Sequence, residues 1–215
     1  MIYTESSNEQ GSPEWFAERR GIPTASEFKR FITATGKYSE SQGKDSYIAE
    51  LIAAKLGWQP SFEGNDDTHR GHFMEDEARR WLQLRTGVKV RTSGFCLHES
   101  GKYGASPDGF TAQGNPVEIK SPALNTFIKW RMKWRMAGGV PKDHIVQCHA
   151  HMAVTGADKC VFVAYGDSEH IDNFYEVVER DEFTDKVTES VVKFCEQLEG
   201  WQRDLTGDEY DAIFA

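Results

Sequence analysis

The stretch GASPDGFTAQGNPVEIKSP, residues 104–122, carries the pattern on which the fold prediction depends. The tripeptide PDG at 107–109 is typical of a tight turn, and VEIK at 117–120 alternates apolar and charged side chains with the period of a β-strand. Glu118 and Lys120 therefore share one face of the predicted strand. An ordinary half-buried strand with solvated charges has the same alternation, so the spacing alone leaves a structural and a functional interpretation open.

The composition of the chain predicts one folded domain. Its 215 residues are 39% hydrophobic, with 6 Trp and 13 Phe, which is enough to bury one core. No apolar run reaches the length of a membrane span, and the first residues lack the pattern of a secretory signal. Four cysteines without close pairing favour a reducing compartment. We expect a cytoplasmic single domain over 1–215, with its core over 12–200 and an acidic C-terminal tail over 202–215.

Charge is distributed unevenly along the chain. The formal net charge is −9, but residues 167–215 contain 15 acids against 4 Lys or Arg, so residues 1–166 carry a net charge of +2. Residues 120–142 contain 6 Lys or Arg and no acid, interleaved with the aromatic residues Phe127, Trp130 and Trp134. This segment is a candidate phosphate-binding surface. The alternative is a helix with a solvated basic face and a buried aromatic face, and for both tryptophans we favour the core.

Helix and strand signals follow an order that predicts a layered fold. Ser12 and Pro13 begin a short helix, and Thr24 with Glu27 forms a predicted capping box for the next one. Apolar periodicity predicts later helices over 47–56, 68–85, 124–136, 145–154 and 182–201. Strands are predicted as two short segments within 88–98, a hairpin over 108–120, and runs over 160–165 and 174–178. The predicted class is α/β or α+β, with a central mixed β-sheet flanked by helices.

Three acids and a lysine converge in this arrangement. Glu75 lies beside the apolar stripe of the 68–85 helix, where a buried salt bridge and a functional site are the two interpretations. Asp108 and Glu118 come from the hairpin, next to Lys120. Carboxylates of this kind hold hard divalent cations, which polarise a phosphate and activate water, while a lysine offsets developing charge. Mg²⁺, with Mn²⁺ as a substitute, is the predicted cofactor, and zinc, which prefers Cys and His, is not.

Two groups of motifs resemble a known nuclease family. SPDG at 106–109 followed by EIK at 118–120 resembles the PD-(D/E)xK nuclease superfamily. Matches that extend from Trp15 to Glu199 resemble the phage lambda exonuclease type, also called the YqaJ-like viral recombinase family. WFAERRGIPTAS at 15–26 is similar to the family's W…R-x-G-x-x-T-A-S motif, and GHFMEDEAR at 71–79 is similar to its G-x-x-x-E helix.

The resemblance implies roles for the acids and the lysine. Asp108 and Glu118 are expected to be metal ligands together with the Ile119 carbonyl, Glu75 is expected to be a further acid of the site, and Lys120 is expected to be the catalytic lysine. A backbone carbonyl on a strand between two functional side chains is able to face the same cation.

The resemblance also implies a site for the end of the DNA. Arg19 and Ser26 fall on the family positions that hold the 5′-phosphate. Ser26 lies in the predicted first turn after Thr24, where free backbone N–H groups favour an anion.

The chain departs from the family in the helix after the site. The family carries Q-x-Q, and here Gln147 matches the first Gln while His149 replaces the second. Gln147 is a candidate site residue, and tuning of the pH dependence is one interpretation of His149. A zinc site formed by Cys148, His149 and His151 is disfavoured, because these spacings on one helix do not converge on one cation.

The function implied by the resemblance is a Mg²⁺-dependent 5′–3′ exonuclease. Such an enzyme degrades one strand of linear double-stranded DNA to mononucleotides and leaves 3′ single-stranded overhangs for recombination by strand annealing. The implied partners are DNA ends with a 5′-phosphate, two further copies in a homotrimeric ring and a single-strand annealing protein, in a phage or prophage setting. A site-specific endonuclease on the same core and a non-catalytic DNA-end-binding subunit are the alternatives.

Overall fold

The computed structural model describes residues 2–58, 66–166, 168–209 and 213, and for 66–73 and 208 it describes the backbone alone. The helices are α1 (Pro13–Glu18), η1 (Ala25–Arg30), α2 (Gln42–Lys55), α3 (Asp66–Thr86), α4 (Leu124–Ala137), α5 (Lys142–Thr155), α6 (Glu182–Thr206) and η2 (Gly207–Glu209). The strands are β1 (Tyr3–Glu5), β2 (Val90–Arg91), β3 (Cys96–His98), β4 (Gly104–Ala105), β5 (Gly109–Thr111), β6 (Pro116–Lys120), β7 (Lys159–Ala164) and β8 (Phe174–Glu179).

The strands form a large and a small sheet. The large sheet has the order β2-β5-β6-β7-β8, in which only β6 and β7 are parallel, so the sheet is mixed as predicted. The parallel pair is joined through α4 and α5, because a parallel connection needs a crossover. The small sheet has the antiparallel order β1-β3-β4. β6, which carries Glu118 and Lys120, is the central strand of the large sheet.

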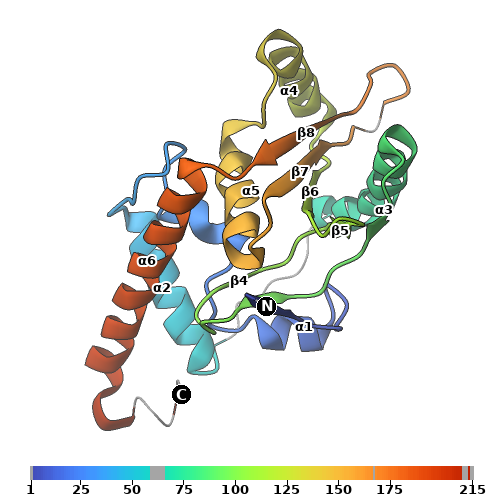
Figure 1. The fold of residues 1–215 in the computed structure, drawn as a ribbon. Helices are drawn as coiled ribbons and strands as arrows, with labels where there is room; N and C mark the ends of the chain where they lie inside the picture. Colours follow the sequence, from blue (N-terminus) through green and yellow to red (C-terminus); the bar gives the residue numbers. More distant parts are fainter. Residues whose placement is uncertain (1, 59–65, 167, 210–212, 214–215) are drawn as a thin grey trace.

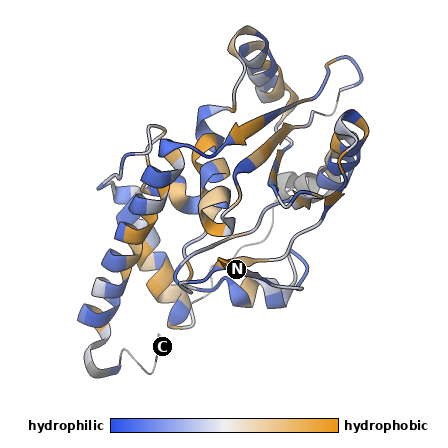
Figure 2. Ribbon diagram, viewed as in Figure 1, coloured by the Kyte–Doolittle hydropathy of each residue, from blue (hydrophilic) through white to orange (hydrophobic). Residues whose placement is uncertain are grey.

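Helices cover both faces of the large sheet (Figure 1). On one face, α3 packs through Ala78 and Leu82 against the apolar side chains of β6 and β7. On the other face, α4 and α5 pack on β7 and β8 through a cluster that contains Phe127, Met152 and Phe162. Figure 2 shows apolar residues along β7, whose last five residues are buried, as expected for a strand covered on both sides. Glu118 and Lys120 belong to the face that α5 covers.

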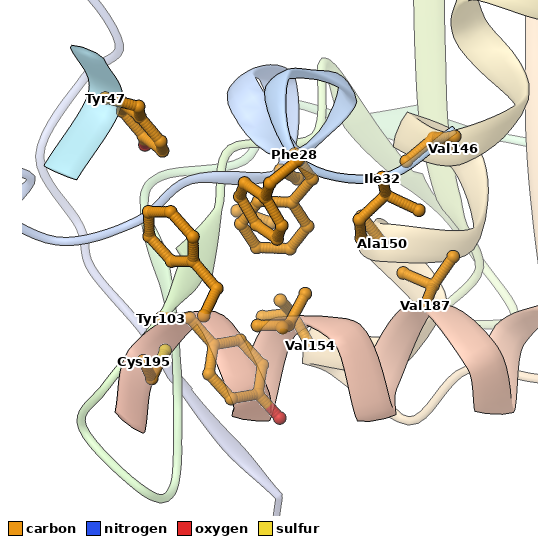
Figure 3. Close-up of a cluster of buried hydrophobic side chains, with 14 of the residues drawn as sticks. Phe28, Ile32, Tyr47, Tyr103, Val146, Ala150, Val154, Val187 and Cys195 are labelled. Atoms are coloured by element: carbon orange, nitrogen blue, oxygen red, sulfur yellow. The ribbon is translucent and has the colours of Figure 1, made fainter. Parts of the chain in front are cut away.

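A second core joins the small sheet to the helices. η1, α2, α5 and α6 surround a cluster of buried side chains, part of which is shown in Figure 3. Phe31 stacks on Phe194 of α6 with ring centroids 4.0 Å apart. Val146, Ala150 and Val154 of α5 point into this cluster, so α5 is shared between the two cores.

The structure corrects several details of the sequence-based prediction. Thr24 and Glu27 do not form a capping box, because the Thr24 side chain accepts from Arg19 Nη2 at 3.3 Å and η1 is a 3₁₀-helix.

The two strands expected within 88–98 lie in different sheets. A Cβ at Gly94, between them, would lie 2.0 Å from the Ser6 carbonyl oxygen, so only glycine permits this contact with the N-terminal segment.

Element boundaries also differ from the prediction. β1 and β4, with 3 and 2 residues, were not predicted. α2 begins at Gln42, five residues earlier than predicted. α6 continues to Thr206, with Gln202 buried, so the first residues of the predicted tail over 202–215 are helical. No helix in the described part of the chain combines the length and the apolar character needed to span a bilayer.

Two leucines on α3 provide a test of the packing under the sheet. Leu82 is 2% exposed and contacts the cluster beneath β6, whereas Leu84 is 88% exposed. Leu82→Ala should lower the free energy of unfolding by about 2–5 kcal/mol, because it leaves a cavity. Leu84→Ala, the matched control, should lower it by no more than about 0.5 kcal/mol. Urea denaturation measures both, and equal losses would contradict the packing described here.

Candidate active site at the end of β6

The end of β6 brings Asp108, Glu118, Ile119 and Lys120 together. The Asp108 N–H donates to the Val117 carbonyl at 2.9 Å, and the Asp108 carboxylate accepts from the Ile119 N–H at 2.5 Å. Asp108 lies immediately before β5. Its carboxylate therefore accepts the Ile119 N–H in place of a backbone carbonyl of a longer β5. Because the N–H and C=O of one strand residue point to the same side, the Ile119 carbonyl faces the space beside Asp108.

The turn before β5 is held against α3. Arg79 Nη1 donates to the Asp108 carbonyl at 2.8 Å and lies 3.6 Å from Glu75 Oε2. Gly109 permits the close approach of β2 to this turn, because a Cβ there would lie 2.5 Å from the Arg91 carbonyl oxygen. The predicted Glu75 therefore borders the site from the opposite face of the sheet, with its side chain 23% exposed.

Glu118 is the buried charge of the site. Its side chain has no solvent exposure, Oε2 lies 2.6 Å from His151 Nε2, and Oε1 forms an ion pair with Lys120 Nζ. Burial acts to raise the pKa of Glu118, but Lys120 and His151 outweigh it and lower the pKa to about 2. Glu118 is thus a carboxylate at neutral pH, and His151 Nε2–H is the donor.

Asp108 and Lys120 respond in opposite ways to these neighbours. Burial and the charge of Glu118 raise the pKa of Asp108 well above its ordinary value, Glu75 adds to the effect, and Lys120 opposes it. Burial acts to lower the pKa of Lys120, but Glu118 and Asp108 outweigh it and raise the pKa above its ordinary value. The site therefore contains more carboxylate groups than one ammonium group neutralises.

The donor set fits a hard divalent cation. Asp108, Glu118 and the Ile119 carbonyl offer oxygen donors in one place, and a cation there would relieve the repulsion between the two carboxylates, which adds to burial in raising the pKa of Asp108. Within the described residues, no three His, Cys, Asp or Glu side chains already stand as a metal cluster, and Glu118 is engaged by Lys120 and His151. Lys120 is 32% exposed, so it has room to move from Glu118.

Several polar atoms are available to a ligand. Among the described residues, the buried hydroxyls of Ser106 and Ser121 and the buried His151 Nδ1 have no hydrogen-bond partner. Ser106 precedes the Asp108 turn, and Ser121 follows Lys120. Buried polar atoms without partners are unusual in folded proteins and are found where water or a ligand binds.

α5 brings His151 to the site, whereas the sequence had singled out His149. His149 Nδ1 lies 2.8 Å from Thr184 Oγ1, so His149 faces α6 and not β6. Gln147 precedes His151 by one helical turn and shares its face. Cys148 lies in the core cluster under α4. Cys148, His149 and His151 thus point toward three different neighbours and do not converge on one point.

The predicted 5′-phosphate residues lie next to the small sheet. The Arg19 guanidinium lies over the Trp15 ring at 3.9 Å, and its buried Nε has no hydrogen-bond partner among the described residues. Burial lowers the pKa of Arg19. Ser26, half-buried, follows Thr24, and Thr24 is bridged to Gly104 at the start of the 104–122 stretch. Four residues of extended chain, about 14 Å at most, connect this bridge to Asp108.

Comparison with known proteins places this site in a family. The family model for the YqaJ-like viral recombinase domain matches residues 14–158, which include Arg19, Glu75, Asp108, Glu118 and Lys120. The chain belongs to the YqaJ-like viral recombinase domain family. No protein in the curated set matches the chain significantly.

Solved structures resemble this YqaJ-like domain over nearly its full length. An alkaline exonuclease from Laribacter hongkongensis, LHK-Exo, is 30% identical with a TM-score of 0.71, covering 90% of this chain and 98% of the other. The same enzyme in complex with dAMP gives 28% identity and a TM-score of 0.68 over the same shares. A phage-related exonuclease from Haemophilus somnus, 17% identical with a TM-score of 0.60, covers 84% and 96% and shares the fold. The predicted fold is therefore confirmed, and the YqaJ-like domain is a nuclease.

Three residues near the YqaJ-like site were not predicted from the sequence. Arg79 and His151 each lie one turn after a predicted site residue, Glu75 and Gln147, and this i to i+4 spacing is a usable signal. His144 stacks on Phe162 with ring centroids 5.8 Å apart, and burial and the charge of Lys120 lower its pKa to about 4. No local pattern marks His144, because its position depends on how α5 packs on β7.

Substitution of His151 tests how the buried charge of the YqaJ-like domain is compensated. His151→Leu should lower the free energy of unfolding by about 3–5 kcal/mol, because it removes one partner of a buried carboxylate. His151→Gln keeps an amide donor and should lose less, about 1–2 kcal/mol. Urea denaturation at pH 7 with a chelator measures both. If Leu and Gln cost the same, or if Glu118→Gln does not reduce the loss caused by His151→Leu, the hydrogen bond is not what His151 contributes.

Proposed function

We propose that this nuclease is a Mg²⁺-dependent 5′–3′ exonuclease that degrades one strand of linear double-stranded DNA to mononucleotides and leaves a 3′ single-stranded overhang for strand annealing. The observation that carries the proposal is the convergence of Asp108, Glu118 and Lys120 at the end of β6. The related LHK-Exo supports it, because that enzyme is an alkaline exonuclease and its complex contains dAMP, a mononucleotide.

Asp108, Glu118, the Ile119 carbonyl and Glu75 are the residues that would hold Mg²⁺, or Mn²⁺ in its place. The ion would polarise the scissile phosphate and lower the pKa of a water molecule. Asp108 is fixed for this role by the Ile119 N–H, and Glu118 is fixed by His151, so both carboxylates are oriented before a ligand binds.

Lys120 acts as a positive charge in this proposal. Its pKa is raised above the ordinary lysine value, so the side chain stays protonated at neutral pH and is a poor proton acceptor. A protonated lysine beside the scissile phosphate offsets the charge that develops during hydrolysis. Gln147, on the α5 face that also carries His151, is proposed to orient water or phosphate through its side-chain amide.

Arg19 and Ser26 are proposed to set the polarity of digestion by holding the 5′-phosphate of the DNA end. The buried Arg19 Nε, which has no hydrogen-bond partner in the part of the chain that the structure describes, supports this role, since a guanidinium favours two or more acceptors on one phosphate. We also propose a homotrimeric ring and a single-strand annealing protein as partner. A ring would let the net positive residues 1–166 face the DNA while the acidic C-terminal part lies outside.

The function is tested with linear duplex DNA that carries 5′-phosphate or 5′-hydroxyl ends, beside a closed circle, with Mg²⁺ or a chelator. Mononucleotides should be released from phosphorylated 5′ ends with Mg²⁺ only, and the circle should stay intact. Cleavage of the circle would identify a site-specific endonuclease. Absence of products with any divalent cation, together with retained binding, would identify a non-catalytic DNA-end-binding subunit.

Lys120→Ala provides the chemical control for this assay. It should abolish product formation while end binding, measured by anisotropy in chelator, stays within a few-fold of the wild type. Lys159→Ala removes a lysine that pairs with Glu179 at the far end of the sheet and should keep near-wild-type activity. Activity of Lys120→Ala within a few-fold of the wild type would remove Lys120 from the mechanism.

Arg19→Ala tests the proposed phosphate site separately from the chemistry. The variant should lose most of the preference for 5′-phosphate over 5′-hydroxyl ends, a loss of about tenfold or more, because a charged hydrogen bond to phosphate is removed. The ratio of initial rates on the two substrates measures it. Arg20→Ala is the neighbouring control, and an unchanged ratio in Arg19→Ala would reject the assignment.

A further inference from the structure

A cavity of about 660 Å³ lies between α3, α4 and the edge strand β8. Its walls combine aromatic and basic side chains, namely Trp81, Arg85, Arg131, Trp134, Phe174 and Tyr175. Because β8 is the edge strand of the large sheet, the cavity receives residues from both faces of that sheet. None of these residues has a role in the proposed reaction.

The guanidinium of Arg131 in this cavity has too few hydrogen-bond acceptors. Its guanidinium lies over the Trp134 ring at 4.6 Å, and its side chain is only 20% exposed. Nη1 is buried and has no hydrogen-bond partner among the described residues. Nη2 lies 3.7 Å from Asp172, whose side chain is 92% exposed and therefore screened by water. A buried donor without an acceptor is costly, and a ligand that supplies the acceptor would remove that cost.

The aromatic walls are fixed before any ligand binds. Trp134 Nε1 donates to Glu176 Oε1, which also accepts from the Gly139 N–H at 3.1 Å. Trp81 on α3 is held edge-on by Tyr165 and Tyr175, each with ring centroids 6.4 Å away. Rigid aromatic surfaces bind a flat ligand with a small loss of side-chain entropy.

The cavity is close to the reaction site. Lys120 pairs with Ala164, and Ala164 pairs with Phe174 in the cavity wall, so two strand spacings, about 10 Å, separate the two places. Tyr165, which contacts Trp81, donates its N–H to the Lys120 carbonyl at 2.9 Å.

The chemistry of the walls selects the ligand. Aromatic faces stack on bases, and a guanidinium binds a phosphate. The carboxylates of Asp172 and Glu176 at the same cavity disfavour a polyphosphate, which carries several adjacent negative charges. A base within a duplex is already stacked on its neighbours, whereas an unpaired base has free faces. We propose that this cavity binds one unpaired nucleotide of single-stranded DNA that leaves the reaction site, with its base on the aromatic wall and its phosphate on Arg131.

This inference rests on the proposed function, and binding measurements separate the two. The probe is a labelled oligothymidylate with a 5′-hydroxyl end, in chelator, so that neither cleavage nor the Arg19 site contributes. Arg131→Ala should weaken binding by about 10- to 100-fold, the effect of losing a charged hydrogen bond. Lys133→Ala removes the same charge from an exposed position on α4 outside the cavity and should weaken it no more than about threefold.

A second pair of variants covers the case in which Arg131→Ala does not fold. Arg85 is exposed at the cavity and Arg80 is exposed on α3 outside it, so both can be removed without loss of packing. Arg85→Ala should weaken oligothymidylate binding several-fold more than Arg80→Ala. Equal binding by the two members of either pair would overturn the proposal.

Two further readouts make the result specific. If Arg131→Ala binds normally but has a changed native mass, the cavity is a contact between subunits and the proposal is wrong. If Arg131→Ala binds normally and the wild type still digests phosphorylated duplex ends, the cavity assignment fails and the exonuclease function stands. If the wild type shows no nuclease activity but the Arg131 effect on binding persists, the proposed function fails and the cavity assignment stands.

Discussion

The buried carboxylate of Glu118 is the constraint on which the rest of the site depends. A charge without solvent exposure in the centre of a sheet is tolerated only when neighbouring groups compensate it. His151 and Lys120 provide this compensation, the first from α5 and the second from β6 itself. The distance between α5 and β6 is therefore set by a hydrogen bond of 2.6 Å as well as by apolar packing.

Asp108 depends on a different compensation. Its carboxylate is held by a backbone N–H, whereas its carbonyl is held by Arg79 from the opposite face of the sheet. Elements on both faces of the sheet thus meet at one strand end. This arrangement keeps two carboxylates close to each other although burial and their mutual repulsion both raise the pKa of Asp108. A site in which two carboxylates repel each other favours a divalent cation, and this property supports the proposed cofactor.

The distribution of charge is consistent with a nuclease of acidic composition. Much of the negative charge belongs to residues 167–215, including α6, which lies across α5 from the large sheet (Figure 1). The basic residues of α4 lie at the other end of the molecule, near β8. α5 lies between the acidic helix α6 and the large sheet, and salt screens exposed charges over about 10 Å. Net charge alone would have argued against DNA as a substrate, and the local distribution does not.

The sequence by itself determined the layered class, the order of most helices and strands, and the residues Glu75, Asp108, Glu118 and Lys120 as a candidate site. These features depend on local periodicity, turn composition and motif spacing, which are properties of neighbouring residues along the chain. Tertiary structure decided that 88–98 divides between two sheets, that His149 faces α6 while His151 contacts Glu118, and that Arg131 and Trp81 line one cavity. Each of these features depends on contacts between segments far apart in sequence, which the packing of α3, α4 and α5 on the sheet determines. Helical periodicity specifies which face of a helix is buried, but it does not specify which element that face contacts.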